Sequence, residues 1–226
     1  MTIYTLKTDP LSSHSRILMF TKRERPSIIL DVGCADGFLA KLMVQQGHTV
    51  HGIEGNAEDA ARANTICKSV TIGNLDDVPS MDFPFEKGEI DIIIFGSILE
   101  HTHDPLKTVK DLLPYLKKGG KVIAAISNIT HLYVRLNLLI GRFPYAQKGL
   151  LDRTHVHFFT PSSARRLLRD AGLSIQQRAV CPTPLPLVFP STAKGRPLHV
   201  IHLMSYALTK MWPSLLGYVF VYQAKK

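Results

Sequence analysis

Cysteine, long apolar runs and, in the second half, acidic residues are scarce in this sequence of 226 residues. The three cysteines, Cys34, Cys67 and Cys181, lie far apart and form no C-x-x-C pair. This excludes a zinc ribbon or a disulfide framework and fits a reducing compartment. No apolar run approaches the roughly 18 residues of a spanning helix, and the first residues lack the apolar stretch of a signal peptide. We therefore expect a cytoplasmic protein.

Charge is distributed very unevenly along the chain. Residues 1–127 carry 14 Lys and Arg against 16 Asp and Glu, which leaves a net charge of −2. Residues 128–226 carry 13 basic against 2 acidic residues, which leaves +11. Such an asymmetry indicates either an anionic partner near the second half or a basic face that is merely solvated.

Strand and helix patterns alternate from residue 28 to about residue 127. Apolar, β-branched runs predict buried strands over residues 27–32, 48–54, 69–73, 89–97 and 121–127. Helical spacing and capping residues predict helices over residues 37–47, 56–68 and 104–120. Pro114 is expected to kink or end the last of these helices. The alternation predicts a parallel sheet with helices on both faces, which binds its ligand at the carboxyl ends of the strands.

The pattern is less regular after Ser127. Residues 128–159 begin like a helix and continue like a loop, and residues 181–197 are too rich in proline for regular structure. A well-capped helix is predicted over residues 160–173, two further strands over 174–180 and 218–226, and an amphipathic helix around 198–212. We find neither an internal repeat nor a second domain, so one domain over residues 1–226 is expected.

The turn between the first strand and the first helix, GCADG, consists mostly of small residues. Small residues let the backbone approach a ligand closely, and the following helix offers N–H groups. The spacing G-x-A-x-G is a poor match to the dinucleotide fingerprint, because Phe38 stands where its third glycine would fall. Glu54 ends the second strand, where a carboxylate can accept hydrogen bonds from both hydroxyls of a ribose. A plain strand–helix corner is the alternative.

Four segments in register resemble the successive motifs of class I S-adenosylmethionine-dependent methyltransferases. They are ILDVGCADG, GIEGN, GNLDD and DIIIFGSILEHTHDP, within residues 28–127. The resemblance implies an α/β, Rossmann-like fold: a seven-stranded, mostly parallel sheet whose last strand is antiparallel and lies beside the sixth. It also implies a cofactor-binding half of about residues 1–127 and a substrate-binding half of about residues 128–226.

The resemblance implies S-adenosyl-L-methionine as cofactor and S-adenosyl-L-homocysteine as product. The residues that it assigns to cofactor binding are Asp31, Gly33, Cys34, Ala35, Gly37, Glu54, Asn74, Leu75 and Ser97. Ala35 replaces the usual middle glycine, and Asn74 replaces the commoner aspartate. Asn74 either reads an adenine edge or simply forms a turn.

Histidines at the predicted carboxyl edge are the candidates for acid–base work. His101 follows the fourth strand, where it either removes a proton from the acceptor or only packs on the cofactor. We treat His103 as a surface residue. The segment LDRTHVH suggests a substrate clamp, in which Arg153 contacts an anionic substrate group, His155 lies near the reacting hydroxyl and Asp152 orients one of these two. The alternative is a salt-bridged structural loop. A metal site built on these side chains is disfavoured, because no spacing is specific for one.

Two segments of the second half permit more than one interpretation. Arg135 and Arg142 frame an apolar helix that is either a lid binding an amphiphilic substrate or, as we prefer, a helix packed on the sheet. Residues 198–220 combine Trp212 with apolar and basic residues, which leaves a weak membrane-surface role open. We prefer a core helix there as well.

The preferred function is O-methylation of a small-molecule or saccharide acceptor, and the basic second half favours an anionic one. The segments RLNLLIGRFPY and GLLDRTHVHFFTPSSARRLLRDAGL resemble a bacterial methyltransferase subgroup associated with glycan assembly. N- or C-methylation of a quinone-like, lipid or amino-acid-derived acceptor is the alternative, as is a non-catalytic module that binds the cofactor for a partner protein. Nucleic acid is a less favoured partner, because no basic stripe with interleaved aromatic residues is present.

Overall fold

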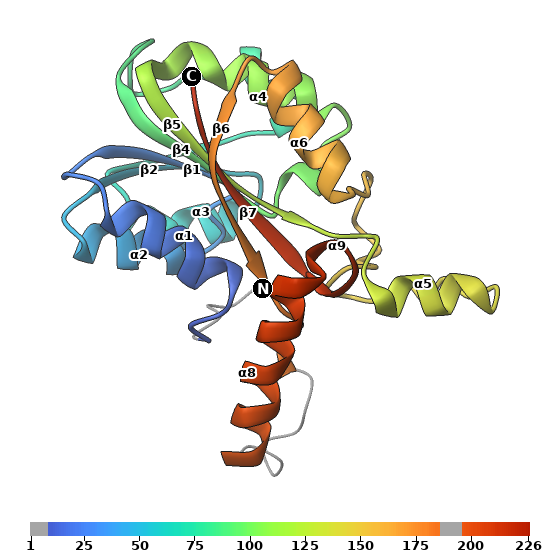
Figure 1. The fold of residues 1–226 in the computed structure, drawn as a ribbon. Helices are drawn as coiled ribbons and strands as arrows, with labels where there is room; N and C mark the ends of the chain where they lie inside the picture. Colours follow the sequence, from blue (N-terminus) through green and yellow to red (C-terminus); the bar gives the residue numbers. More distant parts are fainter. Residues whose placement is uncertain (1–8, 186–195) are drawn as a thin grey trace.

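A seven-stranded sheet forms the centre of the molecule in the computed structural model, which describes residues 9–185 and 196–226 (Figure 1). Its strands are β1 (Ile28–Val32), β2 (Thr49–Glu54), β3 (Ser69–Ile72), β4 (Ile90–Gly96), β5 (Leu116–Ser127), β6 (Ser174–Cys181) and β7 (Val219–Lys225). Their spatial order is β3-β2-β1-β4-β5-β7-β6. All seven predicted strands are therefore confirmed.

Strands β1 to β5 pair in parallel, and β7 lies antiparallel between β5 and β6. This is the sheet that the family resemblance implied. The chain moves outward from β1 through β2 to β3 and then returns to β4 on the other side of β1. A topological switch point therefore lies between β1 and β4, and ligands of such sheets bind at the carboxyl ends of these strands.

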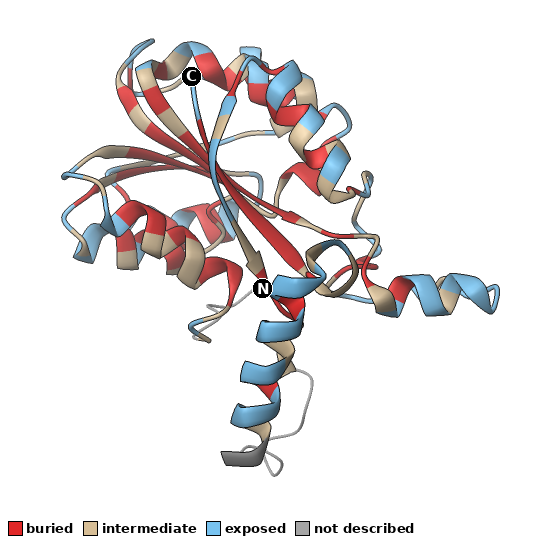
Figure 2. Ribbon diagram, viewed as in Figure 1, coloured by how far each residue is buried: buried red, intermediate tan, exposed pale blue. Residues whose placement is uncertain are grey.

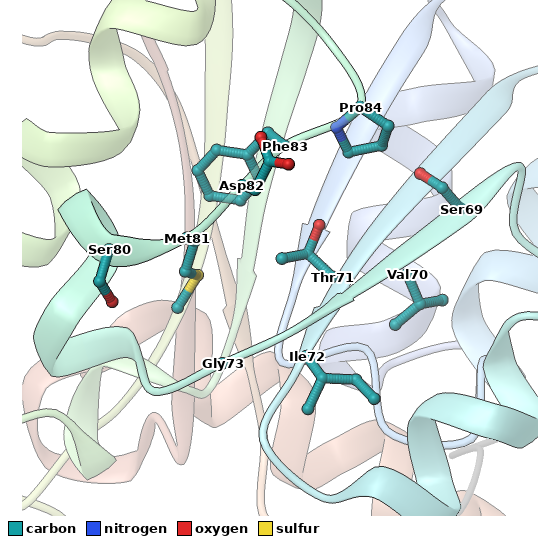
Figure 3. A pocket seen from close by; sticks show the side chains of 10 residues that line it. All are labelled: Ser69, Val70, Thr71, Ile72, Gly73, Ser80, Met81, Asp82, Phe83 and Pro84. Carbon is teal, nitrogen blue, oxygen red and sulfur yellow. The ribbon is translucent and has the colours of Figure 1, made fainter.

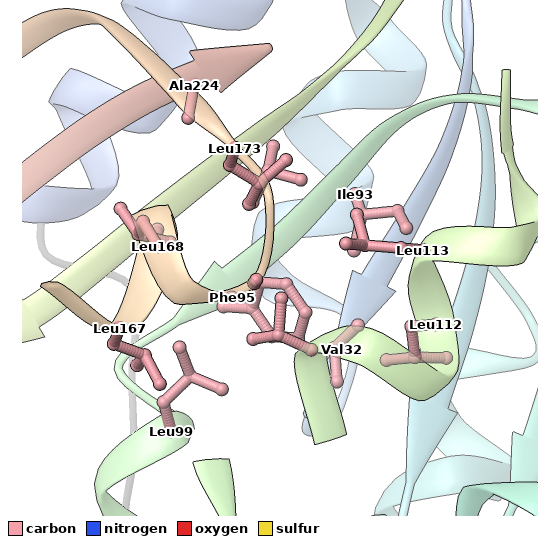
Figure 4. Packing of buried hydrophobic residues seen from close by; sticks show 14 of the residues in the cluster. Val32, Ile93, Phe95, Leu99, Leu112, Leu113, Leu167, Leu168, Leu173 and Ala224 are labelled. Atoms are coloured by element: carbon pink, nitrogen blue, oxygen red, sulfur yellow. The ribbon is translucent and has the colours of Figure 1, made fainter. Parts of the chain in front are cut away.

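Helices cover both faces of the sheet. Helices α1 (Ser13–Lys22), α2 (Phe38–Gln45) and α3 (Ala57–Ala63) pack on one face. Helices α4 (Pro105–Leu112) and α6 (Pro161–Asp170) pack on the other, where their leucines meet Val32, Ile93 and Phe95 (Figure 4). Neighbouring residues of β4 point to opposite clusters, which explains the unbroken isoleucine run of this strand.

Local signals set the ends of most helices. Asn56, Asp104 and Thr160 cap α3, α4 and α6 through their side chains, and Thr160 forms a reciprocal capping box with Ser163. Pro114 ends the α-helical part of its segment, as predicted, within the short 3₁₀ turn Leu113–Tyr115. The residues that follow were expected to be helical, but they belong to β5 because Leu116 pairs with Ile90. Helix α1 was not predicted.

The preferred interpretation of two helices is wrong. Helix α5 (Leu132–Leu139) projects from the body, and of its described residues Val134 alone is buried while Leu139 is 81% exposed (Figures 1 and 2). Helix α8 (Arg196–Met211) projects as well and is followed by α9 (Pro213–Leu216). Neither helix packs on the sheet as a core element. None of the described helices combines the length and apolar character needed to cross a membrane.

Candidate functional site

The turn after β1 is held in a shape that requires small residues. Gly33 and Gly37 have φ angles of +73° and +82°, and Ala35 has +50°. A Cβ atom on Gly33 would lie 2.7 Å from the side chain of Ile98, and one on Gly37 would lie 3.1 Å from Ala63 Cα. The backbone of this turn therefore packs too closely against its neighbours for larger side chains.

Glu54 connects the end of β2 to this turn. Its Oε2 accepts a hydrogen bond from Ala35 N at 2.8 Å, and its Oε1 accepts one from Asn56 N at 2.9 Å. Gly33 N donates to Ile53 O at 2.8 Å, so the turn and the strand end form one unit. Each carboxylate oxygen keeps further lone-pair capacity for a ligand hydroxyl.

A cavity of about 370 Å³ opens at the carboxyl ends of β1, β2 and β4. The residues that line it are Gly33, Ile53, Glu54, Gly55, Gly73, Asn74, Leu75, Asp76, Ile98, His101 and Thr102. Four of the predicted cofactor residues therefore lie on its wall, together with the candidate base His101. Cys34, Ala35 and Gly37 belong to the turn itself, Asp31 lies in β1 and Ser97 follows β4; none of these five is part of the lining.

Hydrogen bonds to the side chains of Asn74 and Asp76 shape the loop after β3. Asn74 Oδ1 accepts from Asp76 N at 3.0 Å, so the amide oxygen forms a turn, which was one of the two interpretations. Asp76 accepts from His103 through both its ring Nδ1 and its backbone N, at 2.6 and 2.7 Å. Burial alone would raise the pKa of Asp76, but the hydrogen bonds from His103 outweigh it and lower the pKa. His103 is exposed, as expected, and also fixes the cavity wall.

Two predicted cofactor residues lie beneath the turn rather than on the cavity wall. Asp31 is 3% exposed, and burial, followed by the nearby charge of Glu54, raises its pKa to about 7. The Cys34 thiol packs beneath Gly52, and its contact with Cys67 together with burial raises its pKa. Cys34 therefore behaves as a core residue of this turn.

Ser97 follows β4 with a φ of +60°, a conformation that L residues rarely adopt. Its backbone N donates to Ala125 O at 3.0 Å and to Phe95 O at 3.2 Å. Strained residues of this kind occur at functional sites when the surrounding structure holds them in place. Here the strain turns the chain sharply, so that Ile98 and His101 reach the cavity.

A contact chain from the second half reaches His101. Asp152 is 1% exposed, and its Oδ1 accepts from both Thr154 N at 2.9 Å and Thr154 Oγ1 at 2.7 Å. His101 Nδ1 lies 3.2 Å from Thr154 O and 3.1 Å from Thr154 Oγ1. Both oxygens must accept, because one is a carbonyl and the other has given its proton to Asp152. The proton of neutral His101 is thus assigned to Nδ1, which leaves Nε2 as the basic nitrogen.

His155 lies directly against His101. Their ring centroids are 4.8 Å apart, in an edge-to-face arrangement. Burial lowers the pKa of His155, and the charge of His101 contributes in the same direction while that of Glu100 opposes it. A neutral imidazole at neutral pH follows from this shift. The two predicted histidines are therefore brought together, although they are far apart in the sequence.

Glu100 and Thr154 are site residues that the sequence did not single out. Glu100 is fully buried; its Oε1 accepts from Ser127 N at 2.7 Å, and its carbonyl accepts from Val156 N and His157 N. It therefore joins β5 to the segment that carries His155. No feature of the sequence marked Glu100. The D-x-T pattern of residues 152–154, in contrast, is typical of an Asp side chain that accepts a hydrogen bond from the backbone N two residues later.

The predicted substrate-binding arginines lie outside the cavity lining. Arg153 is exposed, and its backbone N donates to Ala146 O at 3.0 Å. Arg135 Nε donates to Thr130 O at 2.6 Å, which stabilises the start of α5. His157 Nε2 lies 2.8 Å from His103 O, so His157 connects its segment to the loop before α4. Substrate contact by either arginine stays a prediction.

A larger cavity of about 540 Å³ lies beside the first, between β3 and residues 80–84 (Figure 3). Gly73 belongs to both cavities, and Met81 packs over the position where its Cβ would be. None of the predicted site residues lines it. Within residues 9–185 and 196–226, no cluster of His, Cys, Asp or Glu is arranged to hold a metal ion.

Known proteins share both the sequence pattern and the fold. Residues 7–178 match the family model described as a methyltransferase domain. Two curated relatives, both ubiquinone biosynthesis O-methyltransferases, come from Cupriavidus pinatubonensis and Saccharophagus degradans. The first is 26% identical over 79% of this chain and 72% of its own length. The second is 28% identical over 66% of this chain and 64% of its own length, which is less than two thirds.

The fold has a solved counterpart of nearly the same length. A SAM-dependent methyltransferase from Archaeoglobus fulgidus superimposes with a TM-score of 0.60 at 18% identity, and 94% of each chain is covered. The family match spans most of this chain, and the cavity holds the turn and the carboxylate that the motifs led us to expect. The chain therefore belongs to the methyltransferase domain family, and it shares the fold of that S-adenosylmethionine-dependent methyltransferase.

Proposed function

We propose that this chain methylates a hydroxyl oxygen of a small aromatic, quinone-like acceptor bound beside His101. The observation that carries the proposal is that His101 lines the same cavity as Glu54 and contacts His155. Both curated relatives are named as O-methyltransferases of ubiquinone biosynthesis, which supports oxygen as the target atom. They favour the quinone-like acceptor, which was the sequence alternative, over a saccharide.

The residues present fit S-adenosylmethionine. Glu54 can accept from ribose hydroxyls, Asn74 and Leu75 line the cavity and are assigned to the adenine, and Gly33, which has no side chain, lets the backbone approach the methionine part. Asp31 lies beneath that turn as a partner for an ammonium group. When bound, the cofactor supplies a sulfonium methyl group, and its transfer leaves S-adenosylhomocysteine.

His101 acts as the base in this proposal. With Nδ1 directed at Thr154, its Nε2 can accept the proton of an acceptor hydroxyl as that oxygen attacks. Asp152 is a positioning residue, because it orients Thr154, which in turn contacts His101. His155, neutral because burial lowers its pKa, adds no positive charge that would oppose protonation of His101.

Aromatic rings on the acceptor side support a planar substrate. The ring of His155 meets Phe158, which meets Phe143, which in turn meets Tyr145, at centroid distances of 5.9, 5.7 and 5.0 Å. Edge-to-face rings of this kind pack well against another flat apolar ring. Arg153, exposed on the same segment, is available for a carboxylate on such an acceptor.

The test is an acceptor screen that follows formation of S-adenosylhomocysteine. Dihydroxybenzoates with an apolar side chain represent the proposed class, and uronic acids represent the saccharide class. We expect turnover with the phenols, and a fall in kcat of about 100-fold in His101→Ala. Binding of S-adenosylhomocysteine, measured by calorimetry, should stay unchanged. His199→Ala, an exposed histidine on α8, is the control and should keep wild-type kcat.

Three results would overturn parts of this proposal. Methylation of uronic acids but not of phenols would exclude the quinone-like acceptor. Methylation at a nitrogen or carbon of the product, located by NMR, would exclude O-methylation. Wild-type kcat in His101→Ala would exclude the proposed base. A role of His155 in catalysis also predicts where kcat falls at low pH. Because burial lowers the pKa of His155 below its ordinary value of 6.5, the ring is protonated, and kcat falls, only below that pH.

A further inference from the structure

Helix α8 presents most of its apolar side chains to solvent, whereas its buried side chains are polar. His202 and Thr209 are buried, and Ser205 and Tyr206 are half-buried on the same side. The exposed apolar residues of the segment are Val200, Ile201, Leu203, Met204, Leu208, Met211 and Trp212. A helix on the surface of a soluble protein has the opposite arrangement.

Polar contacts with the α1 region hold α8 in this orientation. His202 Nε2 lies 2.7 Å from Asp9 Oδ2, and Arg16 NH2 donates to Tyr206 Oη at 2.9 Å. Arg16 and Lys210 also lie over the Tyr206 ring, at 5.3 and 4.6 Å from its centroid. Turning the apolar side inward would break these contacts and leave His202 without its partner. The outward apolar face is therefore built into the fold.

Helix α5 and the residues after it expose a second apolar surface. Tyr133, Leu136, Leu138, Leu139 and Ile140 are each more than half exposed. Together with the exposed apolar residues of α8 they form what we call the apolar edge. Figure 2 shows both helices mostly in the colour of exposed residues.

Both helices leave the sheet at the edge where the cavity lies. Helix α5 follows the carboxyl end of β5, at Ser127. Helix α8 precedes β7, whose first residue, Val219, pairs with Ser127 because the two strands are antiparallel. The apolar edge therefore adjoins the carboxyl edge that holds Glu54 and His101.

The charge around the apolar edge is positive. Residues 182–226 contain no Asp or Glu, and neither do residues 128–151. Arg135, Arg142 and Lys148 accompany α5, and Lys210 accompanies α8. A second copy of the chain would bring like charges together on this face, whereas an anionic surface complements it.

We propose that the apolar edge docks on an anionic lipid bilayer, with helix α8 lying in the interface. Apolar side chains, flanking basic residues and a terminal tryptophan are the combination that interfacial helices use. Trp212 sits at the level of the headgroups, and the basic residues pair with anionic lipids. Docking places the acceptor cavity near the membrane. The docking proposal does not depend on which acceptor is methylated.

The test is co-sedimentation of the full chain with vesicles of phosphatidylcholine, alone or mixed with phosphatidylglycerol. No acceptor is added, so the result does not depend on the proposed function. We expect binding to the mixed vesicles, weakened by salt, and a loss of at least about tenfold in the double variant Met204→Glu, Leu208→Glu. Val44→Glu, which changes an exposed apolar residue of α2, is the control and should bind like the wild type.

Two outcomes would overturn the proposal. One is equal sedimentation of wild type and double variant with the mixed vesicles. The other is a wild-type dimer that ignores vesicles and that Leu203→Glu converts to a monomer in analytical ultracentrifugation, since a second copy would then cover the face. Circular dichroism and the melting temperature verify that each variant is folded, and because α8 turns these side chains outward, little change is expected.

Discussion

Helix α2 of the first half and helices α5 and α8 of the second half place their apolar side chains in opposite environments. In the first half, α2 buries Leu39, Ala40 and Met43 against the sheet. In the second half, α5 and α8 turn leucine, isoleucine and methionine side chains to solvent while α8 buries His202. Helix α2 thus buries its apolar side chains in the core, whereas α5 and α8 expose apolar side chains that are available for contacts outside the chain.

The two halves also differ in charge. The first half is nearly neutral and buries a carboxyl, Asp31, beneath the cofactor turn. The second half carries +11 and has only two acidic residues, Asp152 and Asp170. Asp152 is buried and bonded to Thr154, while Asp170 is exposed. Replacing Asp152 and Asp170 in turn therefore distinguishes the effect of a buried, hydrogen-bonded carboxylate from the effect of the net charge alone.

The largest effect on stability is expected at Asp31. Its folded pKa of about 7 exceeds the ordinary 3.8, so its stabilising contribution is full below the lower value and is lost as pH rises through the upper one. The interval between 3.8 and about 7 corresponds to on the order of 4 kcal/mol. The difference in unfolding free energy between Asp31→Asn and the wild type should therefore shift in favour of the variant when the pH is raised from about 5 to about 8.

Urea unfolding at these two pH values measures that gain directly. Asp82→Asn, at an exposed position of the first half, is the control and should show no such dependence. An Asp31→Asn variant that differs from the wild type by the same free energy at both pH values would show that Asp31 ionises normally in the folded chain.

A smaller effect, on catalysis, is expected at Asp152. Asp152→Asn keeps an oxygen for Thr154 but loses the negative charge, so His101 is oriented less firmly. We expect kcat to fall about tenfold, with KM nearly unchanged and an altered pH profile. Asp170→Asn removes the same charge from an exposed site and should leave all three unchanged. Equal effects of the two substitutions would reduce Asp152 to a contributor of bulk charge.

The smallest effects are expected at two matched helix caps. Asn56 caps α3 in the first half and Thr160 caps α6 in the second. Replacing either residue by alanine should cost about 1 kcal/mol of unfolding free energy in a single transition. Two separate transitions, with Thr160→Ala shifting only one of them, would show that the halves unfold independently instead of as one domain.

Much of the fold was predictable because its signals are local. Period-two and period-3.6 patterns, Asn56, Asp104, Thr160 and the glycines at turns fixed all seven strands and the capped helices. Helix α1 was missed because its polar first turn, SHSR, hides a face that buries Ile17 and Phe20. The environment of α5 and α8 was misjudged because an apolar sequence does not state which side faces the protein.

The candidate site was predictable only in part. Motif order placed Glu54, Asn74 and His101 on one cavity, since the carboxyl ends of parallel strands meet at one edge. The link from Asp152 through Thr154 to His101 was not predictable, because it joins residues from distant segments through a loop. Glu100 was missed for the same reason: its partners, Ser127 and Val156, are set by the packing of the second half on β5.

Calorimetric titration with S-adenosylhomocysteine, of wild type and Glu54→Ala, tests the assignment of the cofactor cavity most directly. Removing the carboxylate should weaken binding by about 100-fold, because charge-assisted hydrogen bonds to the ribose are lost. Glu86→Ala, at an exposed position, is the control and should bind like the wild type. Melting temperatures verify that the turn at Ala35 survives. Unchanged affinity in a folded Glu54→Ala variant would contradict the assignment of this cavity to the cofactor.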